Sequence, residues 1–318
     1  MKRIKIPHTN LEVSALCYGV GGFGTAAHGE LTDRLLVQFL EAGGNFVDTA
    51  HCYGFWAKEG QGASERALGD SLQRLKARDK VVVATKGAHP DCGVDYRRPA
   101  DFLSAELRAS DIDDSLERMG IETIDLYYLH RDDGVTPVED VIDRLNREVQ
   151  RGRIRFLGAS NWSVQRIEAA NAYASQSGLQ GFVASQVQWS LAEPTWRATA
   201  DPSSRYVSEE EFAWHSKSQL PVVAYSATAN GYFAGDGDAP GAFVSPVNRA
   251  RLERARELSV RRDCTPTQVA LAYLMRQPFP TIPLFSTLKS VHLSEALASV
   301  EVELSENDVK WLHLGEDT

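Results

Sequence analysis

The stretch that decides the fold is IDLYYLHRDDGVTPVEDVIDRLNREVQRGRIRFLGAS, residues 124–160. Short apolar runs stand at its two ends, and each has the length and composition of a buried strand. Between them Val138, Val141, Ile142 and Leu145 recur at helical spacing. The pair Thr136-Pro137 precedes them, a small polar cap followed by proline in the first turn. The stretch therefore predicts a strand, a helix and a second strand.

The same alternation runs along the whole chain. The eight strand candidates are ALCYG, NFVDT, VVVATK, IDLYYLH, IRFLGAS, FVASQVQ, PVVAYS and FPTIPLF. The amphipathic stretches between them lie at 32–42, 64–75, 101–118, 137–150, 163–173, 207–217 and 249–275. An N-terminal β-hairpin (RIKIP and LEVSAL) precedes them, and helices near 290–298 and 305–314 follow. This order predicts one α/β domain over residues 1–318, a (β/α)8 TIM barrel, with a doubly wound open sheet as the alternative.

Composition excludes several classes of function. The net charge of −9 over 318 residues argues against nucleic-acid binding and gives no support for binding to an anionic membrane. No apolar run approaches the ~18 residues of a membrane span, and the N-terminus lacks the apolar core of a signal peptide. The four cysteines form no C-x-x-C pair, so we expect free thiols in a reducing cytoplasm. A nucleophilic role for Cys52 has no supporting pattern.

Polar residues stand where the predicted strands end, which is where barrel enzymes carry their catalytic groups. They are Asp48, Lys86, His130, Ser160, Asn161 and Gln186, with Tyr53 five residues beyond Asp48. A lysine beside a tyrosine stabilises the phenolate, so we expect the pKa of Tyr53 to fall and the phenol to donate a proton near neutrality. Asp48 would keep Lys86 charged. This set is suited to carbonyl reduction.

Two other chemistries use some of the same residues. Lys86 could form a Schiff base in a class I aldolase, although Asp48 as a neighbour would keep the amine protonated. A metal-dependent hydrolase needs clustered ligands, and the eight histidines are scattered along the sequence. No metal site is expected.

Four motifs resemble those of the aldo-keto reductase family, in the family's order. They are DTAHCYG around Asp48 and Tyr53, ATKG around Lys86, YYLH ending at His130, and GASNW with Ser160 and Asn161. The similarity continues in GASERALG at 62–69, QVQWS at 186–190, VVAYS at 222–226 and the TIP region near the end. Each motif is weak by itself, whereas four tetrad positions in order are specific.

The resemblance implies a role for each position. Tyr53 would be the general acid. Lys86, paired with Asp48, would lower the pKa of Tyr53, and His130 would orient the substrate carbonyl. For the cofactor it implies that Ser160, Asn161 and Gln186 contact the nicotinamide carboxamide. Trp189 would stack on the nicotinamide ring. The backbone of 225–231, with Tyr225, Ser226, Ala227 and Gly231, would run beside the pyrophosphate. Ser286, Thr287, Lys289, His292 and Glu295 would lie at the adenosine end.

The chain departs from the family pattern mainly near its C-terminus. Phe285-Ser286 replaces a small glycine-containing turn, His292 stands where an arginine often reads the 2′-phosphate, and Ala296 stands where an asparagine often reaches adenine. An arginine offers a phosphate two parallel donors and a neutral histidine offers one. NADP(H) is the family default and is favoured, with NAD(H) as the alternative.

The resemblance implies a small carbonyl substrate, an aldehyde or ketone with sugar-like compounds among the candidates, or the corresponding alcohol. Phe23, Trp56, Trp162 and Trp196 are candidates for the pocket wall, with the long segment 189–207. Some relatives are cofactor-binding subunits of membrane channels with slow turnover, which is the remaining alternative.

The cluster GVGGFG at 19–24 also fits G-x-G-x-x-G, the fingerprint of a dinucleotide site. That fingerprint requires a helix to begin within the motif, and the helical pattern here begins only near Thr32. We therefore interpret the cluster as the loop after the first barrel strand, close to the substrate mouth.

Overall fold

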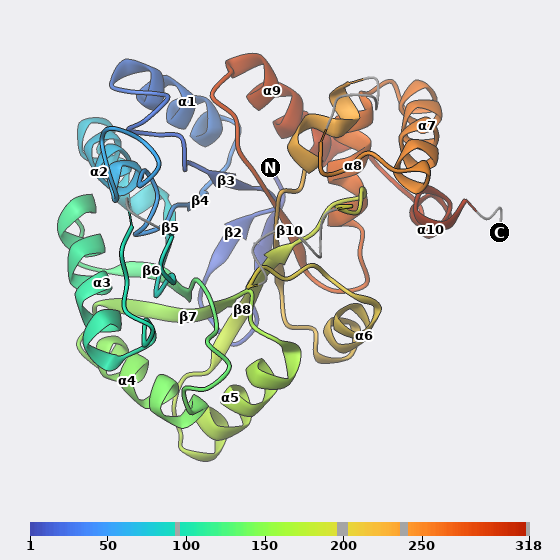
Figure 1. Ribbon diagram of the computed structural model, residues 1–318. Coiled ribbons are helices and arrows are strands. Elements are labelled where there is room, and N and C mark those ends of the chain that lie inside the picture. Colours follow the sequence, from blue (N-terminus) through green and yellow to red (C-terminus); the bar gives the residue numbers. More distant parts are fainter. Residues whose placement is uncertain (93–95, 196–202, 236–240, 316–318) are drawn as a thin grey trace.

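The protein is described by a computed structural model, and the structure describes residues 1–92, 96–195, 203–235 and 241–315. Eight parallel strands form a closed barrel in the order β10-β3-β4-β5-β6-β7-β8-β9 (Figure 1). Closure confirms the predicted TIM barrel and excludes the open sheet. The strands are β3 (Cys17–Gly19), β4 (Phe46–Asp48), β5 (Val82–Gly87), β6 (Ile124–Leu129), β7 (Ile154–Ser160), β8 (Phe182–Gln188), β9 (Val222–Tyr225) and β10 (Thr281–Phe285).

Helices surround the barrel and follow most of the strands (Figure 1). They are α1 (Glu30–Glu41), α2 (Ala63–Leu75), α3 (Ala105–Met119), α4 (Val138–Gln150), α5 (Val164–Gln176), α6 (Glu209–Ser218), α7 (Pro246–Arg261), α8 (Pro266–Met275), α9 (Ser290–Ala298) and α10 (Glu306–Leu314). Three short 3₁₀ helices are η1 (Arg78–Lys80), η2 (Ala229–Ala234) and η3 (Ser299–Glu301). None of the helices in the described part of the chain has both the length and the apolar character that crossing a bilayer requires.

The predicted amphipathic stretch 249–275 is two helices rather than one. Helix α7 ends at Arg261, and Asp263 adopts a left-handed backbone conformation with φ of 51°. The Thr265 hydroxyl accepts a hydrogen bond from the backbone N–H of Gln268, and Pro266 occupies the first turn of α8. The chain therefore restarts as a new capped helix at the polar-proline pair.

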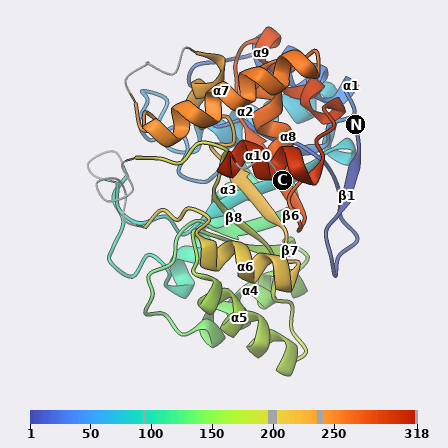
Figure 2. The same ribbon diagram turned by 90° about the vertical axis from the view of Figure 1, so that its right-hand side faces the viewer.

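The N-terminal hairpin closes one end of the barrel. Strands β1 (Arg3–Lys5) and β2 (Glu12–Ser14) pair in antiparallel register, as predicted. Ile6, Leu11 and Val13 belong to the same buried apolar cluster as residues inside the barrel. Figure 2, a view from the side, shows β1 at one end of the barrel beside the N-terminus. The hairpin covers the amino ends of the strands, and the carboxyl ends are left to form the site.

Candidate active site

Five predicted residues meet at the carboxyl ends of neighbouring strands. Asp48 ends β4, Lys86 is the penultimate residue of β5, His130 directly follows β6, and Gln186 lies in β8. Tyr53 comes from the loop after β4. All of these except Tyr53 are at least nine-tenths buried, and parallel register places them around one mouth.

Lys86 is the centre of this group. Its ammonium forms an ion pair with Asp48 and donates to the carbonyl oxygen of Thr49 at 2.7 Å. The Tyr53 hydroxyl lies 3.4 Å from Nζ, and the Tyr53 ring centroid lies 4.9 Å from it. Gln186 Nε2 donates to the second carboxylate oxygen of Asp48 at 2.9 Å. The cation is thus held between a carboxylate and a phenol.

The protonation states follow from burial and charge. Burial alone would lower the pKa of Lys86, but the Asp48 carboxylate and Tyr53 raise it above its ordinary value. Lys86 therefore stays charged, as the sequence predicts.

The pKa of Tyr53 does not follow the expectation. Burial raises it above the ordinary value, and the charge of Lys86 lowers it only in part. The cause is desolvation, which penalises the phenolate more than the neighbouring ammonium stabilises it. Tyr53 is consequently a neutral phenol near neutral pH, the form that donates a proton.

His130 is a neutral imidazole in this structure. Burial, followed by the charges of His89 and Arg131, holds its pKa well below the ordinary range. Its Nδ1 lies 3.6 Å from Cys52 Sγ, and burial raises the pKa of the Cys52 thiol to about 12. The thiol can donate to Nδ1 in the tautomer that carries the ring proton on Nε2. In that tautomer His130 is a hydrogen-bond donor from Nε2.

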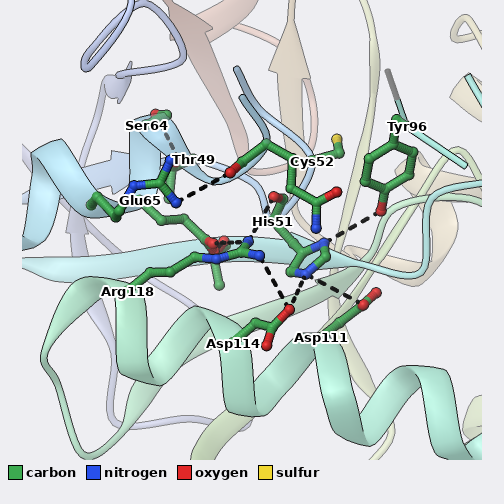
Figure 3. A network of polar contacts seen from close by, with 12 residues as sticks. Thr49, His51, Cys52, Ser64, Glu65, Tyr96, Asp111, Asp114 and Arg118 are labelled. Atoms are coloured by element: carbon green, nitrogen blue, oxygen red, sulfur yellow. Dashed lines mark hydrogen bonds and ion pairs between the residues drawn. The ribbon is translucent and has the colours of Figure 1, made fainter. Parts of the chain in front are cut away.

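A buried polar network anchors the loop that carries Tyr53. Arg118 of α3 donates to Glu65 of α2 at 3.2 Å, to the carbonyl of His51 at 3.0 Å and to Asp114 at 3.1 Å (Figure 3). The Thr85 hydroxyl of β5 donates to the other Glu65 oxygen at 2.7 Å. The guanidinium therefore ties the backbone two residues before Tyr53 to two helices.

The imidazole of His51 belongs to the same network. Its Nε2 lies 3.0 Å from Asp114 and 3.5 Å from Asp111, and its Nδ1 lies 3.3 Å from the Tyr96 hydroxyl (Figure 3). Sequence reasoning did not single out this residue. Its place inside DTAHCYG, between Asp48 and Tyr53, was the available signal.

Amide and hydroxyl groups cluster beside the ion pair. Asn161 has a left-handed backbone (φ 59°), and its Nδ2 donates to Ser160 Oγ at 3.1 Å. Its Oδ1 accepts from the Tyr225 hydroxyl at 2.9 Å. Ser160, Asn161 and Gln186 are buried at one side of the mouth. A carboxamide needs donors and acceptors of these types, so the donor set fits a nicotinamide.

Trp189 does not lie where the sequence places it. Its ring is buried and stacks on Phe279 at 5.7 Å, with Phe212 of α6 at 6.1 Å. These contacts belong to the layer between barrel and helices, because the side chain after Gln188 points outward from the strand. The expected stacking role is therefore wrong. The half-buried ring of Tyr225, bonded to Asn161, is the aromatic group beside the carboxamide donors.

The segment predicted to run beside a pyrophosphate is a tight turn after β9. Ser226, Ala229, Asn230 and Gly231 all have positive φ. Ala227 is fully buried within this turn.

The predicted adenosine end is open to solvent. Ser286, Lys289 and His292 are exposed, and Thr287 is half-buried with its carbonyl accepting from the Tyr18 hydroxyl at 2.7 Å. Glu295 instead accepts from the Thr265 hydroxyl at 2.7 Å and so supports the start of α8. Ala296 is buried.

Two of the four pocket aromatics are core residues. Phe23 is fully buried with its ring edge-on to Tyr18, and Trp162 is fully buried against Phe182. Neither forms part of a pocket wall. Trp56 is 55% exposed with its ring 5.8 Å from that of Tyr53, at the mouth. Trp196 lies outside the described residues.

The glycine cluster forms the loop after β3, as interpreted from the sequence. Helix α1 begins only at Glu30. A Cβ at Gly21 would lie 3.2 Å from the Tyr53 ring, and one at Gly22 would lie 3.1 Å from Leu288. These glycines let the loop approach Tyr53 closely.

Comparison with known proteins gives consistent results. The model of the Aldo/keto reductase family matches residues 15–313. The chain is 27% identical over 328 residues to "Probable aldo-keto reductase 1" of Glycine max, covering 96% of this chain and 86% of the relative. It is 28% identical over 324 residues to "Uncharacterized oxidoreductase YrpG" of Bacillus subtilis, covering 98% and 95%.

A third relative and a solved structure extend the comparison. The chain is 28% identical over 327 residues to "Norsolorinic acid reductase" of Aspergillus flavus, covering 97% of this chain and 79% of the relative. The crystal structure of the thermostable aldo-keto reductase Tm1743 with the inhibitor epalrestat superimposes with a TM-score of 0.74 at 21% identity. That superposition covers 98% of this chain and 99% of Tm1743, and it shows a shared fold.

Proposed function

This chain belongs to the aldo/keto reductase family, and on that premise we propose that it interconverts a small carbonyl compound and its alcohol with a nicotinamide cofactor. The observation that carries the proposal is the buried Asp48–Lys86 pair with the Tyr53 hydroxyl 3.4 Å from the ammonium. A carbonyl oxygen gains negative charge as it is reduced, so a neutral phenol backed by a cation matches that change.

Each residue has one task in this mechanism. Tyr53 donates its proton to the carbonyl oxygen, and Lys86 stabilises the phenolate that remains. Asp48 keeps Lys86 charged, and Gln186 holds the second oxygen of Asp48. His130 donates from Nε2 to the same carbonyl oxygen and so orients it. In the oxidation direction the Tyr53 phenolate takes the proton back.

Ser160 and Asn161 would hold the carboxamide of the cofactor, and the Tyr225 ring beside them would cover one face of the nicotinamide. The bound cofactor supplies the hydride. Ser226, Ala227 and Gly231 would offer backbone groups to the pyrophosphate, with Ser286, Thr287, Lys289 and His292 at the adenosine end. We propose NADP(H), with NAD(H) as the alternative, because Lys289 and His292 are the exposed basic groups there.

The substrate would be an aldehyde or ketone that enters beside Trp56, whose exposed ring adjoins Tyr53. A polar carbonyl compound, sugar-like or aromatic, suits an aromatic wall with several polar groups. One relative is named norsolorinic acid reductase, so norsolorinic acid is a sensible member of the substrate panel.

The test is a fluorescence titration with NADPH and NADH, followed by a carbonyl panel under the tighter cofactor. Turnover that consumes cofactor and yields an alcohol supports the proposal. Tight cofactor binding with negligible turnover would instead favour a regulatory cofactor-binding subunit.

A Schiff-base aldolase remains the rival use of Lys86. That reaction needs a neutral amine, and the ion pair with Asp48 opposes it. Borohydride treatment in the presence of a carbonyl substrate distinguishes the aldolase from the reductase, because a covalent adduct at Lys86 would contradict the reductase proposal.

A further inference from the structure

Three residues that are far apart in the sequence bring metal-ligating atoms together behind the catalytic tyrosine. Cys52, His89 and His130 each offer one such atom, and these atoms lie within 4.8 Å of one another. Two of the residues follow different strands, β5 and β6, and the third lies in the loop after β4. The expectation of no metal site was drawn from sequence spacing, which does not register ligands that only the barrel brings together.

The distance between Cys52 Sγ and His130 Nδ1 is the one expected for two ligands of a tetrahedral zinc ion. With Zn–S near 2.3 Å and Zn–N near 2.05 Å, a tetrahedral angle separates sulfur and nitrogen by about 3.6 Å. Cys52 Sγ and His130 Nδ1 are 3.6 Å apart. The His89 and His130 rings lie with centroids 4.6 Å apart at 75°. Side-chain rotation must bring the His89 nitrogen, which lies within 4.8 Å of the other two ligand atoms, to the same ion.

The tautomer of His89 is also set for coordination. Its Nδ1 lies 3.0 Å from the Pro90 carbonyl oxygen and 3.2 Å from Cys92 Sγ, and the tautomer that donates to the carbonyl carries its proton on Nδ1. Nε2 then keeps its lone pair. A backbone carbonyl bonded to the non-ligating nitrogen is the usual support of a metal-binding histidine.

We propose that Cys52, His89 and His130 form a site for a thiophilic divalent cation, zinc, on the Nδ1 side of the His130 ring. Zinc would displace the Cys52 thiol proton to solvent, so binding involves no redox change. Three protein ligands leave a fourth position for water, as in open zinc sites, and the soft sulfur disfavours magnesium and calcium. Half-buried His89 is the ligand nearest solvent.

The site would act as an inhibitory one, a consequence that rests on the proposed function. The His130 ring lies 5.9 Å from the Tyr53 ring, and its Nε2–H is the donor that would orient the carbonyl. An ion bound to Nδ1 would fix the ring from the opposite edge and turn Nε2–H out of line with the carbonyl, so zinc would slow reduction through His130.

The test uses the full chain with reduced thiols and cobalt as a spectroscopic probe. We expect about one equivalent of Co²⁺ to give a thiolate-to-cobalt charge-transfer band, which zinc removes and magnesium does not. Cys52→Ser should abolish the band, and His89→Gln should weaken cobalt affinity at least ~10-fold. Cys264→Ser, which alters a half-buried thiol between α7 and α8, is the matched control and should behave as wild type.

A missing band in the wild-type protein, or a band that survives Cys52→Ser, would overturn the proposal. If Cys52→Ser does not fold, unchanged cobalt affinity in His89→Gln overturns it as well. In activity assays, zinc should inhibit reduction reversibly to chelation, and His89→Gln should need at least ~10-fold more zinc. A protein that binds cobalt through Cys52 yet reduces no carbonyl would overturn the proposed function and leave the metal site standing.

Discussion

The two ends of the candidate site are built very differently. Asp48 and Lys86 are almost completely buried, and each has several protein partners at the catalytic end. Lys289, which precedes α9, and His292 in its first turn are exposed at the predicted adenosine end. A change at the buried end breaks contacts on every side, whereas a change at the exposed end alters only what a ligand meets. The first end should govern chemistry and stability, and the second should govern cofactor choice.

The largest effect is expected from Tyr53→Phe. Removing the proton donor should lower carbonyl reduction between about 100-fold and 10,000-fold, because general acid catalysis contributes that much. Cofactor affinity in a fluorescence titration should stay within about twofold. A variant that keeps most of its activity would show that the proton comes from elsewhere.

Arg118→Met should mainly affect stability. Glu65 is completely buried, so loss of its guanidinium partner leaves an uncompensated charge that costs about 3–5 kcal/mol. Urea denaturation measures this. The double variant Glu65→Gln/Arg118→Met removes both charges and should recover much of the loss. Equal destabilisation in the single and double variants would mean that Arg118 acts through packing or through its other bonds.

His292→Arg probes the exposed end. We expect this change to raise the NADPH-to-NADH preference about tenfold, since a charged hydrogen bond to the 2′-phosphate contributes about 1.5–3 kcal/mol. Midpoints of unfolding should not move for His292→Arg, which alters an exposed side chain. Unchanged ratios of the two dissociation constants would place the adenosine end elsewhere.

The pH profile of reduction should show the smallest effect. Tyr53 must be protonated to donate, and its pKa is raised by burial, so kcat/KM should stay level through neutral pH and fall only near or above pH ~10. Stopped-flow traces of cofactor oxidation across this range give the profile. A fall beginning near pH 7 would mean that Lys86 outweighs desolvation in the working enzyme.

The sequence predicted the barrel and the catalytic corner well because both depend on periodic patterns. Apolar runs gave all eight strands, and a polar residue at a strand end must lie at the mouth. Strand alternation continued from Gln186 places Trp189 on the outer face, and this signal was overlooked. Trp189 packs there against Phe279, and Tyr225 stands beside Asn161 instead.

The cluster of Cys52, His89 and His130 was not predicted, for a related reason. Cys52 and His89 carry no spacing signal, and the pairing of the neighbouring strands β4, β5 and β6 brings them to His130. The sequence predicted a lowered pKa for Tyr53 from a single neighbour, Lys86. Burial of the phenol among the residues of the mouth has the larger effect and raises the pKa. Phe23 and Trp162 look like pocket residues in the sequence, and the structure buries them in the core.

The most direct measurement follows the hydrogen itself. A carbonyl substrate is incubated with cofactor that carries two deuterium atoms at C4 of the nicotinamide, and the alcohol is analysed by mass spectrometry. Our account predicts one deuterium on the carbinol carbon with the wild-type protein and almost no alcohol with Tyr53→Phe. Alcohol without deuterium, or equal labelled product from both proteins, would contradict it.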